Sequence, residues 1–169
     1  MSVEYRLRFD LRVPDTQVCE VIVTQAGLIE ERREVIVLGR SLGKPEEEHG
    51  EMIVFQGTGI FCFFHPESSL GQSIIEEAFG FRPTKNITFR IDKFEHYEDG
   101  ILNMLCTCIA IIKSCTSDCV LLENGDIPLL LRKRGHLTLQ SGDSYWSAKL
   151  EFMAREIGDP YIFKPMSVI

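Results

Sequence analysis

Apolar and charged residues alternate strictly at the start of the chain, over Val3–Val13. A period of two places successive side chains on opposite faces of a β-strand. The pattern therefore predicts a strand with one face in the core and the other toward solvent. The charged positions are Glu4, Arg6, Arg8, Asp10 and Arg12.

Apolar residues recur at helical spacing in residues 18–26, which predicts a first helix that stops at Gly27. A second, shorter helix is expected at Ser69, which forms a capping-box pattern with Gln72 three residues later. Gly80 lies where this helix should stop, since glycine readily adopts the left-handed conformation that ends helices.

The longest predicted helix lies near residues 93–114. Asp92 followed by Glu95 repeats the capping-box pattern at its start, and we expect its end near Ser114. One face of this helix is apolar, so it should form the spine of the core. The apolar positions are Tyr97, Ile101, Met104, Leu105, Cys108 and Ile112.

Short β-rich runs predict the remaining strands. Asn124-Gly125 between two apolar runs is typical of a tight primed hairpin turn, and Gly57-Thr58-Gly59 of another turn. Pro128 cannot donate a ladder hydrogen bond, so its strand is expected at a sheet edge or at a bulge. The runs are residues 35–38, 52–55, 59–64, 86–92, 120–122, 127–131 and 136–139.

These elements predict an α+β fold in which a mostly antiparallel sheet packs against three helices. The pattern weakens from Gln140 onward, although the tail has enough large apolar residues to pack on the body. We find no internal repeat or linker, so we expect residues 1–169 to form one domain. The apolar residues of the tail are Trp146, Leu150, Phe152 and Tyr161.

The chain is acidic, with a net charge of −7. This charge disfavours nucleic acid, because phosphate binding needs a basic face, and it is compatible with a basic protein partner. The longest apolar run, Ile101–Ile112, falls short of the roughly 18 residues needed to cross a bilayer. Charges interrupt the first nine residues, where a secretion signal would be continuous and apolar. We therefore expect a cytoplasmic protein without a membrane partner.

Six cysteines lie inside apolar segments, which favours reduced, buried thiols over a disulfide framework. Cys106, Cys108, Cys115 and Cys119 are close in sequence and raise the question of a metal site. Cys106 and Cys108 should lie about 200° apart around a helix, so they cannot converge on one ion. We expect neither a metal nor a cofactor.

Cys62 and His65 are the best candidates for nucleophilic catalysis, because a histidine can activate a thiol. No cysteine-protease or serine-elbow signature surrounds them. A strand cysteine next to a loop histidine is the simpler interpretation, and we keep a Cys62–His65 enzyme as an alternative.

The most distinctive charged feature is the acidic segment that contains Glu46, Glu47, Glu48 and Glu51, with His49 among them. It can be a solvated loop or a patch that docks a partner. Both interpretations predict exposed side chains, and the second makes these four glutamates candidate partner-binding residues.

Three segments carry a resemblance to a known family: Phe79-Gly80-Phe81-Arg82-Pro83, residues 89–94 (FRIDKF), and the Asn124-Gly125 turn after a Leu-Leu strand. Together with the opening SVEYRLRFDL, they resemble the Sit-type immunity family. Those bacterial proteins are paired with swarming-inhibition toxins. The resemblance implies toxin neutralisation and offers no catalytic residues to transfer.

The sequence therefore predicts a non-catalytic immunity protein that binds and neutralises a cognate, possibly basic, bacterial toxin. Such an inhibitor needs a complementary surface and no chemistry of its own. Two alternatives stay open: a small cytoplasmic enzyme that uses Cys62 and His65, and an adaptor domain with another protein partner.

Overall fold

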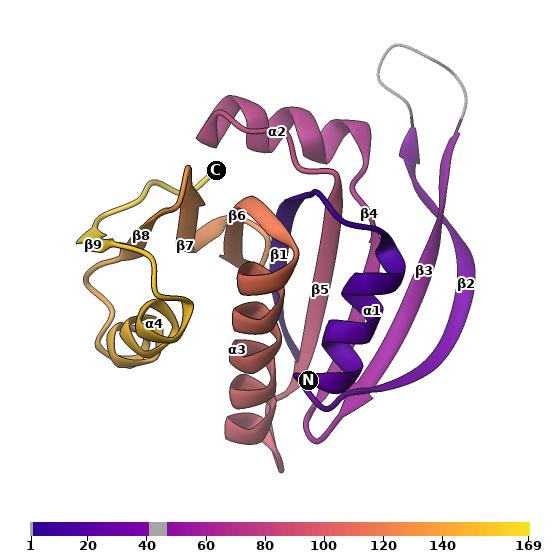
Figure 1. Ribbon diagram of the computed structural model, residues 1–169, viewed down its shortest axis with the longest axis horizontal. Helices are drawn as coiled ribbons and strands as arrows, with labels where there is room; N and C mark the ends of the chain where they lie inside the picture. Colours follow the sequence, from indigo (N-terminus) through magenta and orange to yellow (C-terminus); the bar gives the residue numbers. More distant parts are fainter. Residues whose placement is uncertain (1, 41–46) are drawn as a thin grey trace.

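The computed structural model describes residues 2–40 and 47–169, and within them the chain forms four helices and one nine-stranded sheet (Figure 1). The strand order is β2-β3-β4-β5-β1-β6-β7-β8-β9, and all neighbours run antiparallel except β8 and β9. This confirms the α+β fold with a mostly antiparallel sheet. The strands are β1 (Ser2–Leu11), β2 (Ile29–Arg40), β3 (Glu47–Gly57), β4 (Ile60–Pro66), β5 (Lys85–Asp92), β6 (Thr116–Glu123), β7 (Ile127–Lys133), β8 (His136–Gln140) and β9 (Tyr161–Lys164).

The main core lies between one face of the sheet and three helices. The odd-numbered residues of β1, from Val3 to Phe9, are buried there, as their alternation predicts. These helices are α1 (Asp15–Thr24), α3 (Tyr97–Ser114) and α4 (Ser144–Ile157). Figure 1 shows α1 and α3 next to each other in front of the sheet, with α4 on the other side of α3.

The opposite face of the sheet is covered in part by α2 (Ser69–Phe79). A small apolar cluster there joins Ile75 of α2 to Val120 and Leu122 of β6, and Phe81 completes it. The neighbours of Val120 and Leu122 along β6, Cys119 and Leu121, face the main core. The sheet is thus covered on both faces, unequally.

The helix starts differ from the capping-box predictions. The N-cap of α2 is Ser68, whose hydroxyl accepts from the Gly71 amide at 3.1 Å, whereas Ser69 was expected there. Helix α3 begins at Tyr97 after His96, which caps no amide with its side chain. Asp92 instead accepts from the Phe94 amide at 3.0 Å, as in an Asx turn. The expected ends, Gly80 and Ser114, are confirmed.

The turn between β3 and β4 packs tightly on the start of α3. A Cβ atom on Gly59 (φ +73°) would collide with the His96 carbonyl oxygen, so this turn requires glycine. The Asn103 amide of α3 donates to the Thr58 carbonyl oxygen at 2.9 Å. The Gly57-Thr58-Gly59 segment is therefore a structural turn, as predicted.

The β6–β7 hairpin also follows its sequence signals. Asn124 (φ 53°) and Gly125 (φ 91°) both have positive φ, as a type I′ turn requires. The register shifts where Leu121 pairs with Leu130 and Leu122 with Pro128. Since β7 lies between β6 and β8, Pro128 is accommodated by a bulge and not by an edge.

Helix α4 lies in the tail, where no helix was predicted, so the structure has four helices among its described residues against the three expected. Asp143 accepts from the Tyr145 amide at 2.8 Å to cap its start, and Gly158 ends it in the left-handed conformation. Its buried face packs on the main core, and the members of that face are Trp146, Leu150, Met153 and Ala154.

Candidate partner-binding surfaces

The predicted acidic patch lies on the arm formed by β2 and β3, a hairpin at one edge of the sheet. Glu47, Glu48 and Glu51 belong to strand β3, so the expectation of a loop is wrong for them. The backbone of this segment pairs with β2 in spite of its charges, because an edge hairpin leaves many side chains in solvent. Glu46 lies outside the described residues.

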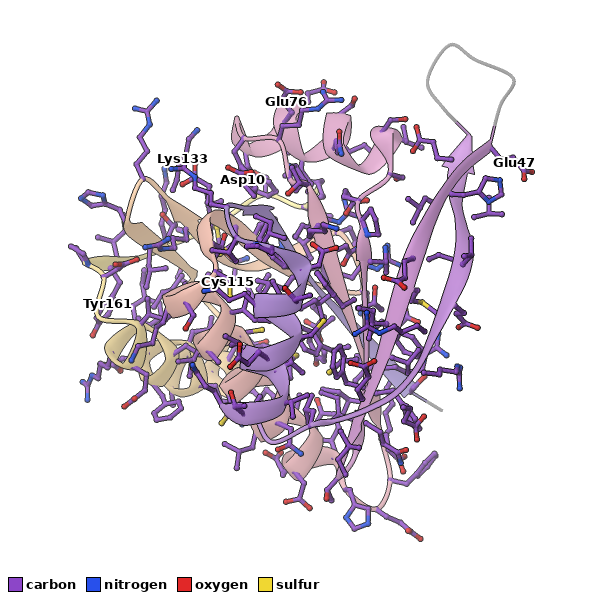
Figure 2. The ribbon with its side chains drawn as sticks, turned by 45° about the vertical axis from the view of Figure 1, so that its right-hand side comes forward. Asp10, Glu47, Glu76, Cys115, Lys133 and Tyr161 are labelled. Carbon is purple, nitrogen blue, oxygen red and sulfur yellow. The ribbon has the colours of Figure 1, made fainter. Side chains whose placement is uncertain are left out.

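The three described glutamates do not form one free acidic surface. Glu48 is half-buried, and its Oε2 accepts from the Ser69 amide at 2.8 Å, at the start of α2. Glu51 lies 3.9 Å from Arg33, which also pairs with Glu30 at 2.7 Å. Glu47 is exposed at the end of the arm, where Figure 2 shows it pointing away from the body of the protein.

A second surface, which the sequence did not indicate, is a groove between α3 and α4. Its volume is about 480 Å³, and its lining is mainly apolar. Leu102 and Phe152 expose 53% and 45% of their surface there. Glu98 and Asp99 stand at its rim, at the N-terminal end of α3. Leu102 lies outside the apolar stripe predicted for this helix. An apolar residue at a position expected to face solvent is the sequence signal that points to this groove.

The Lys149 side chain at this groove is held by its neighbours. Its ammonium lies 3.7 Å from Glu98 Oε2 and 3.7 Å from the centre of the Tyr145 ring. The positive charge of Lys149 is therefore partly balanced by Glu98 and the Tyr145 ring. Asp99 adds a further negative charge at the rim of the groove.

Cys62 and His65 lie on opposite faces of β4. Cys62 is fully buried in the main core, and burial raises the pKa of its thiol well above the ordinary value. His65 faces the α2 side, where its Nδ1 donates to the Pro66 carbonyl oxygen at 2.8 Å. Burial lowers the pKa of His65. Because three residues along a strand reverse the side-chain direction, the two groups cannot form a catalytic pair.

The other cysteines are also core residues, apart from the half-buried Cys106. Burial raises the pKa of Cys19 to about 11 and that of Cys119 to about 12. Within the described ranges, no three His, Cys, Asp or Glu side chains are grouped so that they could hold a metal ion. Among the described helices, none combines the length and apolar character needed to cross a membrane.

Comparison with known protein families identifies a match over most of the chain. The model of a family described as SitI3-like matches residues 3–150, which include most of the sheet, α1 to α3 and the first half of α4. No curated protein and no solved structure matches the chain.

Proposed function

Because the chain belongs to the SitI3-like family of Sit immunity proteins, we propose that it is a non-catalytic immunity protein that binds and neutralises a cognate bacterial toxin. The family match over residues 3–150 is the observation that carries this proposal. The separation of Cys62 from His65 supports it, because the sequence offered that pair as its candidate for catalysis.

Neutralisation by binding requires a surface that complements the toxin. The first candidate is the exposed end of the arm, with Glu47 and Glu51, to which the undescribed Glu46 adds a third acid in the sequence. With a net charge of −7, the protein would attract a basic toxin and raise the rate of encounter. Glu48 serves the fold through its bond to Ser69.

The second candidate is the groove between α3 and α4. Exposed Leu102 and Phe152 offer apolar contact area, while Glu98 and Asp99 favour basic side chains at the rim. Interfaces of this kind combine an apolar centre with a charged edge. The two surfaces lie on different elements, so variants can separate them.

The direct test is to purify the protein with the product of the toxin gene encoded beside it. We expect a stoichiometric complex in size-exclusion chromatography with light scattering, and loss of toxin activity at equimolar amounts. A toxin from an unrelated pair is the control for specificity. A cognate toxin that stays fully active with excess immunity protein would contradict the proposal and favour an adaptor role.

A further inference from the structure

Strand β2 forms one end of the sheet, and no strand of the described residues covers its outer edge. It has 12 residues, about twice the usual length of a strand. Figure 1 shows it along the right-hand border of the molecule. The backbone amides and carbonyls on the outer side of an edge strand can pair with a strand of another chain. The edge of β2 is therefore a site where a further strand can add to the sheet.

Apolar side chains that β2 leaves in solvent add to this edge. Val35 exposes 77% of its surface, Ile29 72% and Val37 54%. Val35 is the most exposed large apolar residue in the described part of the chain. All three side chains are β-branched, and such side chains pack well against a neighbouring strand. A second strand at this edge would thus gain apolar contacts as well as backbone hydrogen bonds.

The charged residues of β2 are divided between the two faces of the sheet. Arg32 and Glu34 pair with β3 residues whose side chains lie away from the main core, so both point to the α2 face. Arg32 Nε lies 3.7 Å from Glu34 Oε1. Arg33 points to the other face, where Glu30 at 2.7 Å and Glu51 at 3.9 Å balance its charge.

This charge pattern is complementary to itself. If a second copy of β2 runs antiparallel to the first, with a two-fold axis at Arg33, then Arg32 lies opposite Glu34 of the second copy and Glu34 lies opposite its Arg32. Directly opposite residues share a face, so two ion pairs would form between the copies. The two Arg33 side chains meet at the axis, and each brings the carboxylates of Glu30 and Glu51 with it.

The apolar ends of the strand match in the same register. Glu31 is an extra residue at a bulge, where the pairing of β2 with β3 shifts by one. Beyond that bulge Ile36 lies opposite Ile29 of the second copy, and both side chains point to the α2 face. The second strand also covers part of the exposed Val35 side chain. Charge and apolar contacts thus select one antiparallel register.

We propose that β2 pairs with β2 of a second copy of this chain, antiparallel about Arg33, to form a dimer with one sheet continuous across both copies. Charges on an edge strand discourage pairing with most other strands, whereas this pattern satisfies its own charges. The paired segment, residues 29–36, is about 26 Å long. Such a small interface predicts a weak dimer that depends on concentration. The inference does not depend on the toxin.

The test is sedimentation velocity of the full chain from low to high micromolar concentration. Glu34→Arg and Arg32→Glu each place two pairs of like charges opposite one another, so each should weaken dimerisation about tenfold or more. Both side chains are substantially exposed, at 58% for Arg32 and 42% for Glu34, so the melting curves should stay those of the wild type. Glu76→Arg is the matched control, because it inverts one charge of the half-exposed ion pair with Arg82 on α2.

An equimolar mixture of Glu34→Arg and Arg32→Glu tests the register itself. Positions 32 and 34 are both positive in one variant and both negative in the other, so the mixture should dimerise again. Both variants keep a net negative charge, so overall attraction would not explain that recovery.

The outcomes are distinct. Dimerisation of the wild type and of Glu76→Arg, its loss in each β2 variant and its recovery in the mixture would support the inference. A wild-type protein that stays monomeric throughout would overturn the dimer, and would leave the immunity proposal intact. Dimerisation that the β2 variants do not change, or a mixture that stays monomeric, would overturn this interface. A monomer whose β2 variants lose toxin binding would assign the edge to a toxin strand and overturn the dimer.

Discussion

Arg8 of β1 and Glu67, just before α2, form an ion pair whose side chains are only 9% and 5% exposed, with Nε and Oε2 separated by 3.3 Å. The pair joins the centre of the sheet to the start of α2. Glu67 Oε1 also accepts from the Ser68 amide at 3.0 Å, which fixes the carboxylate. Both charges have left water, so each depends on the other for its stability.

Removal of one partner should therefore be costly. Glu67→Ala is expected to lower the free energy of unfolding by about 3–5 kcal/mol, because it leaves the Arg8 charge buried and unpaired. Glu76→Ala is the control: its pair with Arg82 is about half exposed on both sides, and such pairs contribute about 0–1 kcal/mol. Urea denaturation measures both. Equal, small losses would show that the Arg8–Glu67 pair is accessible to solvent.

Helix α3 gives a matched pair of leucines for testing its orientation. Leu105 is 3% exposed and Leu102 is 53% exposed, three residues apart on the same helix. Leu105→Asp should cost several kcal/mol, about enough to unfold a marginally stable domain, because it buries an unpaired charge. Leu102→Asp should keep the wild-type melting temperature within a few degrees. A Leu105→Asp protein that melts normally would contradict this helix placement.

The arm should affect the rate of association with the toxin. Glu47→Gln combined with Glu51→Gln is expected to slow association while dissociation and melting temperature stay close to wild type. The wild-type rate should fall as salt rises from 0.1 to 1 M, over which the screening length shrinks from about 10 to about 3 Å. Surface plasmon resonance measures both effects. Unchanged association in the double variant would exclude the arm as the docking site.

His65 should make stability depend on pH. Burial lowers its pKa below the ordinary 6.5, so below that pH the unfolded chain binds a proton that the folded chain does not. The free energy of unfolding should therefore decrease as pH falls below 6.5 and be unaffected by this residue at higher pH. His65→Gln should reduce the slope between pH 7.5 and 5, while His136→Gln, at an exposed position, should preserve it. Identical slopes in both variants would remove His65 as the cause.

The six cysteines should differ in how fast their thiols react with an alkylating reagent. Cys106 is the half-buried one, while the other five are buried. In the native protein, iodoacetamide should therefore modify Cys106 first, and Cys106→Ser should abolish the fast reaction. Peptide mapping by mass spectrometry identifies the labelled site. Rapid labelling of Cys62 or Cys119 would contradict their placement in the core.

The local predictions succeeded where the determining interactions are themselves local. Asn124-Gly125 makes its turn because those two residues tolerate positive φ, and Gly80 ends α2 for the same reason. The start of α2 was misplaced by one residue, because Ser68 and Ser69 are adjacent and each offers a hydroxyl that can cap a helix. In the structure the N-cap is Ser68. The Ser69 amide donates a hydrogen bond to Glu48 of the arm, which lies 21 residues away in sequence.

Helix α4 and strand β9 escaped the sequence analysis, and strand β2 was predicted only in part. In α4, Trp146, Leu150, Met153 and Ala154 have helical spacing between Asp143 and Gly158, but charged and polar residues dilute the pattern. Strand β2 has 12 residues, but the sequence predicted a strand only over residues 35–38. The preceding Glu and Arg residues hid the rest of the strand, and an edge strand tolerates them because their side chains can face water.

The sequence by itself determined the α+β class, the core face of β1, the long helix, the hairpin turns and the family, because these depend on periodicity and on neighbouring residues. Only the tertiary structure decided which polar groups meet. It put Cys62 and His65 on opposite faces of β4, bound Glu48 to the start of α2, and buried Arg8 against Glu67. Residues far apart in the chain make these contacts, and no local pattern of hydrophobic and polar positions records which strands become neighbours.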